Sequence, residues 1–332
     1  MTTLFASCGK DSQDEPLPGE GDIAVHFSTG VSASVSVTET VNTRAVVTTT
    51  LPGNSTVGVY GVIAVTGGDT ASYNMKNTAV TFQENLSNTP YTVLPEGTDP
   101  YGNQTLYYEK TAKFPKGNKA ALAFYAYYPY SARAERREDL GMCIPWTINK
   151  ADMSKTEDYM YTGRLFSGVS KIPIKLKLNH AMARLDFTFY TEDMDVMNSE
   201  PYLTQIEVDA FGAETGWMSL EDGELDYQNT LITYTFPVDS KLISINNRTV
   251  YASFLLPPST VVSRVRYTVR NNLGTNSYEV YSAVNDKPIV ISLAAGKTTK
   301  VNVNYFPKEV QAVVGVKAWE LLKSYDINVK LK

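Results

Sequence analysis

The feature that most constrains the fold of this 332-residue chain is an alternation of apolar and polar residues with a period of two. Successive side chains of a β-strand point to opposite faces, so this alternation is typical of strands with one buried face. It is clearest at residues 57–65, 172–178, 250–256 and 301–305. No amphipathic helical pattern extends beyond a few turns. The sequence therefore predicts an all-β protein built from β-sandwiches with solvent-facing loops.

The phase of this alternation changes near the middle of the chain. Apolar residues occupy even-numbered positions from Ile172 through Leu178 and odd-numbered positions at Leu185, Phe187 and Phe189. A strand cannot change its buried face without a bulge or a crossing between two cores. The change falls at residues 179–184 and predicts a boundary between two sandwich domains, 45–180 and 181–332. The chain length also fits about two domains of roughly 100–200 residues each.

The net charge of -5 is concentrated at the N-terminus. Residues 1–44 hold two basic and six acidic side chains, whereas the rest of the chain is nearly neutral. Residues 9–22 are rich in charged residues, Pro and Gly, which is typical of a solvated tether. The chain also lacks the basic footprint of a nucleic-acid-binding protein. We therefore expect residues 1–44 to be a separate leader unit and expect no nucleic-acid partner.

The leader contains a motif of the kind that is lipidated in bacteria. In Phe5-Ala-Ser-Cys8, small residues precede a cysteine that is followed by a polar, acidic run, as in a lipobox. Only seven residues precede Cys8, fewer than a secretory signal needs, so either the precursor starts upstream or the motif is accidental. If Cys8 is acylated, Cys143 has no disulfide partner and is expected to be a structural thiol. No apolar stretch reaches the roughly 18 residues of a membrane span.

Motifs of the common enzyme classes are absent. The chain has no His-Glu-x-x-His, no Gly-x-Ser-x-Gly and no Gly-rich phosphate loop followed by Lys. The two histidines are His26 and His180, and His180 is expected to be a packed structural residue. The acidic groups at 192–195 and 221–224 are interpreted as solvated loops, although spacing alone leaves a glycosidase-like carboxylate pair open. We predict no catalytic residue, no metal site and no cofactor.

Several short motifs follow one another along the whole chain. They are Phe5-Ala-Ser-Cys8, Asn42-Thr-Arg-Ala45, Phe124-Tyr-Ala-Tyr-Tyr-Pro129, Leu178-Asn-His-Ala-Met-Ala-Arg-Leu-Asp-Phe187 and Val314-Gly-Val-Lys-Ala-Trp319. Their order and spacing resemble the fimbrillins, the type V pilus subunits of the Bacteroidia. The resemblance implies two β-sandwich domains of transthyretin-like, Greek-key topology. It also implies a structural fimbrial subunit that serves cell adhesion and has no enzymatic activity.

The resemblance further implies a maturation route. The subunit is exported through the periplasm as a lipoprotein, with palmitate on Cys8, and reaches the outer membrane surface. An Arg-specific protease then cleaves after an arginine, which in this sequence matches Arg44 before Ala45. Loss of the leader strand opens a groove that the terminal strand of a neighbouring subunit fills. The alternative, that Arg44 is one surface arginine among several, stays open.

Both ends of the chain contain segments that can form strands. Apolar residues alternate around Phe27 and Val31 in the leader. At the other end, Ile327, Val329 and Leu331 alternate with polar residues. Adding a strand to an open sheet edge uses backbone hydrogen bonds for affinity and alternate side chains for register. We therefore predict that the C-terminal segment is the donor strand and that the partners are other copies or related fimbrial subunits.

A second function stays open at this stage. The chain could be a non-polymerising, lipid-anchored adhesin, or a tip or anchor subunit that binds glycans on a host or bacterial surface. Five aromatic side chains could stack on sugars: Tyr125, Tyr127, Tyr128, Tyr130 and Trp217. Packing in a β-sandwich core accounts for these aromatic residues more simply, because buried aromatic side chains commonly pack such cores.

Overall fold

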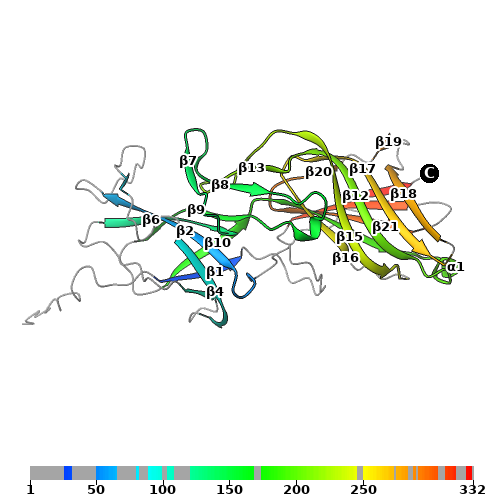
Figure 1. The fold of residues 1–332 in the computed structure, drawn as a ribbon, viewed down its shortest axis with the longest axis horizontal. Helices are drawn as coiled ribbons and strands as arrows, with labels where there is room; N and C mark the ends of the chain where they lie inside the picture. The colour runs from blue at the N-terminus through cyan, green and yellow to red at the C-terminus, as the bar shows by residue number, and fades with distance from the viewer. Residues whose placement is uncertain are drawn as a thin grey trace, which may run out of the picture.

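The protein is an elongated all-β molecule, as the period-two pattern predicts (Figure 1). The computed structural model describes residues 26–31, 50–65, 80–81, 89–98, 103–107, 120–167, 173–244, 250–272, 274–282, 287–288, 291–305, 311–318 and 327–330. Helical structure in these ranges is limited to the 3-10 turn η3 (Met153–Lys155) and the single turn α1 (Met194–Met197). The all-β sandwich class is therefore confirmed.

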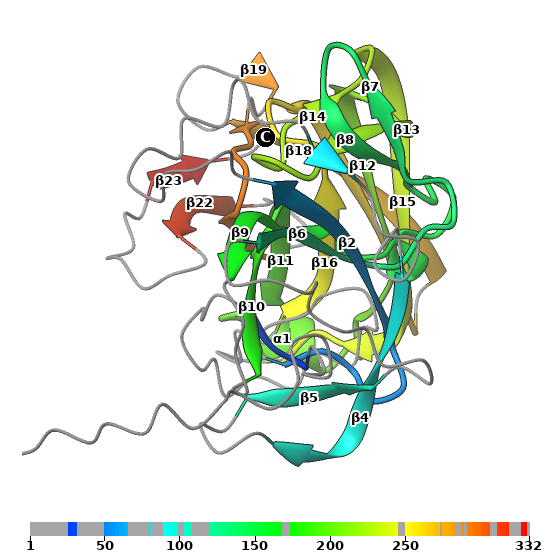
Figure 2. The ribbon, with the colours of Figure 1, turned by 90° about the vertical axis from the view of Figure 1, so that its left-hand side faces the viewer.

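One end of the molecule is formed by an eight-stranded sheet. Its order is β3 (Val80–Thr81), β2 (Thr56–Val65), β4 (Thr89–Thr98), β5 (Gln104–Tyr107), β1 (Phe27–Val31), β10 (Ile174–His180), β9 (Met160–Ser167) and β6 (Ala120–Tyr128). Residues 58–65 of β2 also pair with β6, so the pairing continues from the last strand back to β2. In Figure 2 the molecule is seen from this end, with strands β2, β4, β5, β6, β9 and β10 of the sheet toward the viewer. Within this arrangement β1 has a hydrogen-bonded neighbour on each side.

The other end is a sandwich of two sheets (Figure 1). The first has the order β16 (Val250–Leu256), β11 (Ala183–Tyr190), β21 (Lys297–Asn304), β22 (Gln311–Ala318) and β23 (Ile327–Lys330). The second has the order β15 (Thr230–Leu242), β12 (Tyr202–Gly212), β17 (Val261–Asn271), β18 (Gly274–Ser282) and β19 (Lys287–Pro288), with β20 (Ile291–Ser292) paired to β17. Aromatic rings pack between the two sheets: Phe189 lies 5.1 Å from Tyr267, centroid to centroid.

A small fourth sheet joins the two ends. It has the order β14 (Leu225–Asp226), β13 (Thr215–Ser219), β8 (Gly141–Thr147) and β7 (Glu135–Arg137). Trp146 of β8 is fully buried in the same core cluster as Leu185 of β11. Strands β7 and β8 therefore pack with the C-terminal sandwich although they precede residue 181. The division into 45–180 and 181–332 remains a proposal.

The predicted change of phase coincides with a change of core. Leu176 and Leu178 of β10 are buried in the cluster of the eight-stranded sheet. After β10 ends at His180, β11 begins at Ala183, and its Leu185 and Phe187 are buried in the cluster of the C-terminal sandwich. The chain thus passes from one core to the other at the residues where the alternation shifts.

A polar contact holds the two ends together at the turn after β13. Glu221 in this turn accepts hydrogen bonds from Arg164 Nη2 (2.6 Å) and from the Tyr125 hydroxyl (3.1 Å), both on strands of the eight-stranded sheet. Burial raises the pKa of Tyr125 to about 12, so its hydroxyl stays protonated and able to donate. Gly223 has φ +76°, and a Cβ there would lie 2.0 Å from the Tyr161 ring, so only glycine allows this close approach.

Candidate functional site

Strand β1, which belongs to the predicted leader 1–44, lies in the interior of the eight-stranded sheet. All five of its residues pair with β10 in parallel, from Phe27 opposite Ile174 to Val31 opposite Leu178. On the other side, Ser28 and Thr29 pair with β5 in antiparallel. The Thr29 hydroxyl adds a hydrogen bond to the carbonyl of Leu176 at 3.3 Å. Both edges of β1 are therefore occupied by neighbouring strands.

The side chains of β1 fill the core of the eight-stranded sheet. Phe27 is 1% exposed, and its ring meets those of Tyr91 and Phe124 edge-on, with centroids 5.1 Å away in both cases. Val31 is also buried, and Ser28 and Thr29 are fully buried. A strand that is buried on both faces and paired on both edges leaves a deep slot when it is taken away. That slot would have two open sheet edges, those of β5 and β10.

The C-terminal strand β23 is held less firmly than β1. It is the last strand of the five-stranded sheet and pairs with β22 alone in that sheet, from Val314 opposite Ile327 to Gln311 opposite Lys330. The predicted donor residues Ile327 and Val329 thus lie on an edge strand of their own subunit. Leu331 lies outside the described residues, as do Cys8, Arg44 and Ala45.

The two residues considered for reactivity are structural. Cys143 is fully buried and free, and burial raises its pKa to about 11, so it is a neutral thiol at pH 7. His180 is buried, and its Nδ1 lies 2.9 Å from Asp158 Oδ2. Within the described ranges, no group of three or more His, Cys, Asp or Glu side chains is arranged to hold a metal ion.

The aromatic residues considered as sugar platforms fall into two groups. Tyr125 and Tyr127 are buried core residues, which agrees with the packing interpretation. Trp217 on β13 is only partly buried, and two guanidinium groups lie over its ring, Arg133 at 5.9 Å and Arg137 at 5.3 Å from the centroid. Tyr128 and Tyr130 are also partly buried, and they pack against the two hydrophobic cores. Trp217 is the partly buried ring of this set that lies beneath two guanidinium groups.

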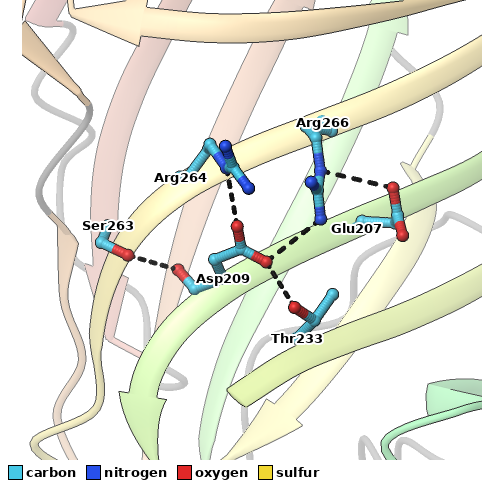
Figure 3. Close-up of polar contacts among 6 residues, drawn as sticks. All are labelled: Glu207, Asp209, Thr233, Ser263, Arg264 and Arg266. Atoms are coloured by element: carbon cyan, nitrogen blue, oxygen red, sulfur yellow. Dashed lines mark hydrogen bonds and ion pairs between the residues drawn. The ribbon is translucent and has the colours of Figure 1, made fainter. Parts of the chain in front are cut away.

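A network of charged side chains lies across the strands of the six-stranded sheet (Figure 3). Asp209 on β12 accepts hydrogen bonds from Thr233 (2.6 Å), Arg264 (2.6 Å) and Arg266 (3.2 Å). Arg266 also lies 3.4 Å from Glu207. Each arginine of this network already faces a carboxylate of the same sheet. The network therefore connects β12 to β15 and β17.

Asp209 is expected to stabilise the sheet only while it is ionised. Burial tends to raise its pKa, but the hydrogen bonds from Thr233 and Arg264 and the two arginine charges outweigh burial and lower the pKa. Its contribution is thus present above the unfolded-state pKa of about 3.9 and is lost as pH falls through the lower folded-state pKa. Asp209→Asn should reduce the free energy of unfolding at pH 7 by about 2 kcal/mol.

The measurement is denaturant unfolding at pH 7 and in steps from pH 5 to pH 2. Glu207→Gln is the control because Glu207 is a carboxylate on the same strand that lies at the longer distance of 3.4 Å from Arg266 Nε. The free energy of unfolding of the parent should fall below pH 4, and that of Asp209→Asn should fall less over the same pH range. An identical acid profile in the parent and in Asp209→Asn would contradict this account.

Comparison with known proteins identifies the class of the chain. A family model described as fimbrillin-like matches residues 43–319. The chain therefore belongs to the fimbrillin-like family. None of the curated proteins matches it by sequence. The family supports a structural, non-enzymatic role in fimbriae or cell adhesion and a cell-surface location. No helix in the described residues is long and apolar enough to span a membrane.

Solved structures share the fold at low sequence identity. One is a protein of Bacteroides uniformis provisionally assigned to cell adhesion, which is 14% identical with a TM-score of 0.56 over 89% of this chain and 98% of that chain. Another, from Bacteroides ovatus with the same provisional assignment, is 16% identical with a TM-score of 0.57 over 90% of this chain and 99% of that chain. At these identities the likeness shows the fold alone.

Proposed function

We propose that this protein is the precursor of a fimbrial subunit that is activated by losing its leader strand and then polymerises by donor-strand exchange. The observation that carries the proposal is the place of β1, a leader strand paired on both edges and buried on both faces. An exposed, hydrophobic sheet edge is an aggregation hazard, so a covering strand keeps the exported monomer inert. Cleavage after Arg44 frees that strand to leave.

The steps before and after cleavage follow the same logic. Cys8 carries the lipid that holds the precursor at the outer membrane. An Arg-specific protease separates residues 1–44 from the body at Ala45. The C-terminal strand of another copy or of a related subunit then displaces β1 from the slot between β5 and β10. The assembled fimbrium serves adhesion.

Loss of hydrophobic burial supplies the driving force for refilling the slot. Phe27 and Val31 are both buried in the core. At about 1.5–3 kcal/mol for each buried side chain, an empty slot costs the subunit about 3–6 kcal/mol. That is a large part of the roughly 5–15 kcal/mol by which a typical domain is stable. A subunit with an empty slot therefore gains strongly from any strand that restores these contacts.

The side chains of the slot favour one register for a tail that runs parallel to β10, as β1 does. In this register each tail residue takes the place of one residue of β1: Ile327 of Phe27, Asn328 of Ser28, Val329 of Thr29, Lys330 of Gly30 and Leu331 of Val31. Ser28 is fully buried, so a charged side chain there would be costly, and this register puts Asn328 there instead of Lys330. A Cβ at Gly30 would meet only Asn103 and Lys175, at 3.6 and 4.0 Å, so a side chain fits there.

The mass of the mature surface protein tests the proposal directly. We expect intact-mass analysis of protein released from the cell surface to give a chain that begins at Ala45. A mass that corresponds to an acylated chain starting at Cys8, in material that is already polymeric, would contradict activation by cleavage. Protein from cells treated with an inhibitor of Arg-specific proteases is the control, and it should keep the acylated leader.

A further inference from the structure

A cavity of about 430 Å³ opens on the surface beside Trp217, where the small connecting sheet meets the start of β15. Two aromatic side chains line it, Trp217 and Tyr227. Its polar lining consists of two carboxylates, one amide and two hydroxyls: Glu214, Asp226, Gln228, Thr215 and Thr230. The volume falls within the roughly 300–1,000 Å³ of small-ligand sites and is large enough for one or two sugar rings.

The walls of this cavity are held in place by contacts outside it. Glu214 accepts a hydrogen bond from Lys150 Nζ at 2.6 Å. Arg137 lies over the Trp217 ring and 3.6 Å from Asp226 Oδ2, so one guanidinium connects the aromatic wall to a carboxylate. Tyr227 packs edge-on against the buried Trp146 with centroids 5.8 Å apart. The polar and aromatic groups are thus oriented before any ligand arrives.

We propose that this cavity, hereafter the Trp217 cavity, is a binding site for neutral saccharides. A sugar ring presents an apolar C–H face, which suits an indole or phenol ring, and a rim of hydroxyls that both donate and accept hydrogen bonds. Carboxylates accept from such hydroxyls, and an amide and threonine hydroxyls can do either.

The charges select the class of saccharide. The lining contains two carboxylates and no lysine, arginine or histidine. The nearby cations Lys150 and Arg137 already pair with these two carboxylates. The acid group of a sialylated, sulfated or uronic acid residue would therefore meet no cation in the lining that compensates its desolvation, which costs binding energy. Neutral hexoses and N-acetylhexosamines carry no such penalty. The site therefore discriminates between neutral and acidic glycans.

The site is independent of the proposed polymerisation. Its residues come from the stretch 213–232 and include none from β1, β5, β10, β22 or β23. A monomeric precursor and an assembled subunit therefore both present it. Repetition of one weak site along a polymer would add avidity without any new contact.

The experiment uses the uncleaved full chain, so its result does not depend on cleavage or assembly. Saturation-transfer NMR and titration calorimetry are carried out with lactose and chitobiose as neutral probes and with 3′-sialyllactose as the acidic probe. The parent should bind at least one neutral probe at millimolar concentration and bind the acidic probe more weakly. Trp217→Ala and Asp226→Asn should each weaken binding by about tenfold, which corresponds to about 1.4 kcal/mol.

Phe211→Ala is the matched control. Phe211 is an exposed aromatic residue (51%) on the neighbouring β12 that does not line the cavity, so its removal should leave binding unchanged. Thermal unfolding of every variant checks that the fold is kept, and Asp226→Asn preserves size if Trp217→Ala is unstable. Failure to bind either neutral probe, or equal binding by the parent and both cavity variants, would overturn the saccharide site. Equal affinity for 3′-sialyllactose would overturn the charge selection.

Discussion

Replacing Arg44 with glutamine should leave the protein a monomer after treatment with an Arg-specific protease, whereas the parent should give polymer ladders on unheated gels. Glutamine keeps much of the length of the side chain but removes the guanidinium that such proteases recognise. The leader then stays covalently attached, and β1 remains between β5 and β10. We expect the effect on assembly to be complete because no slot opens in an uncleaved subunit.

The control for this variant is Arg136→Gln. Arg136 is an exposed arginine on β7, at a distance along the chain from the leader. Its replacement should leave both cleavage at Arg44 and ladder formation unchanged. N-terminal sequencing of the parent product should begin at Ala45. Polymerisation of Arg44→Gln at the parental rate, with the leader still attached, would rule out cleavage at this position as the activating step.

The order of events is also constrained by the structure. Cleavage after Arg44 cuts the chain beyond the end of β1 at Val31, so it does not itself remove the strand. The five pairs to β10 and the burial of Phe27 still hold the fragment. The cut leader should therefore remain bound until an incoming strand displaces it. We therefore expect cleavage and strand exchange to be two separate steps.

The sequence was informative wherever one face of a strand alone determines the pattern. In β10, Leu176 and Leu178 are buried while Lys175 and Lys177 are exposed, as the alternation predicts. It was less informative where both faces are buried. Asp186 of β11 is polar and reads as solvent-facing, yet it is 2% exposed. Hydrogen bonds from Arg184 (2.6 Å) and Ser253 (2.7 Å) compensate its burial, and no local pattern encodes them.

The candidate site shows the same limit more clearly. A strand-forming pattern around Phe27 is visible in the leader, but its partners are not. The Thr29 hydroxyl bonds to Leu176, 147 residues away, and the rings around Phe27 come from β4 and β6. Tyr91 was not singled out by the sequence because nothing near it marks it as the wall of a slot. Such contacts are set by topology, which periodicity does not specify.

Deleting residues 326–332 should prevent assembly of cleaved subunits while leaving the monomer folded. In the monomer this tail forms only β23, an edge strand with four register pairs to β22, so its loss removes little of the described structure. In a neighbour's slot it would instead have a strand on each side. In the proposed exchange the tail would therefore gain a second paired edge. Size-exclusion chromatography with light scattering, before and after protease treatment, measures the outcome.

Point variants in the tail distinguish a specific register from mere length. In the proposed register Ile327 takes the place of Phe27 between the Tyr91 and Phe124 rings, so Ile327→Asp puts a charge into a buried apolar space and should stop assembly. Lys330→Ala is the matched control, because Lys330 takes the partly exposed place of Gly30. This variant should assemble at the parental rate. Equal assembly by both variants would show that the tail is not read in this register. Assembly of the 326–332 deletion would show that another strand is the donor.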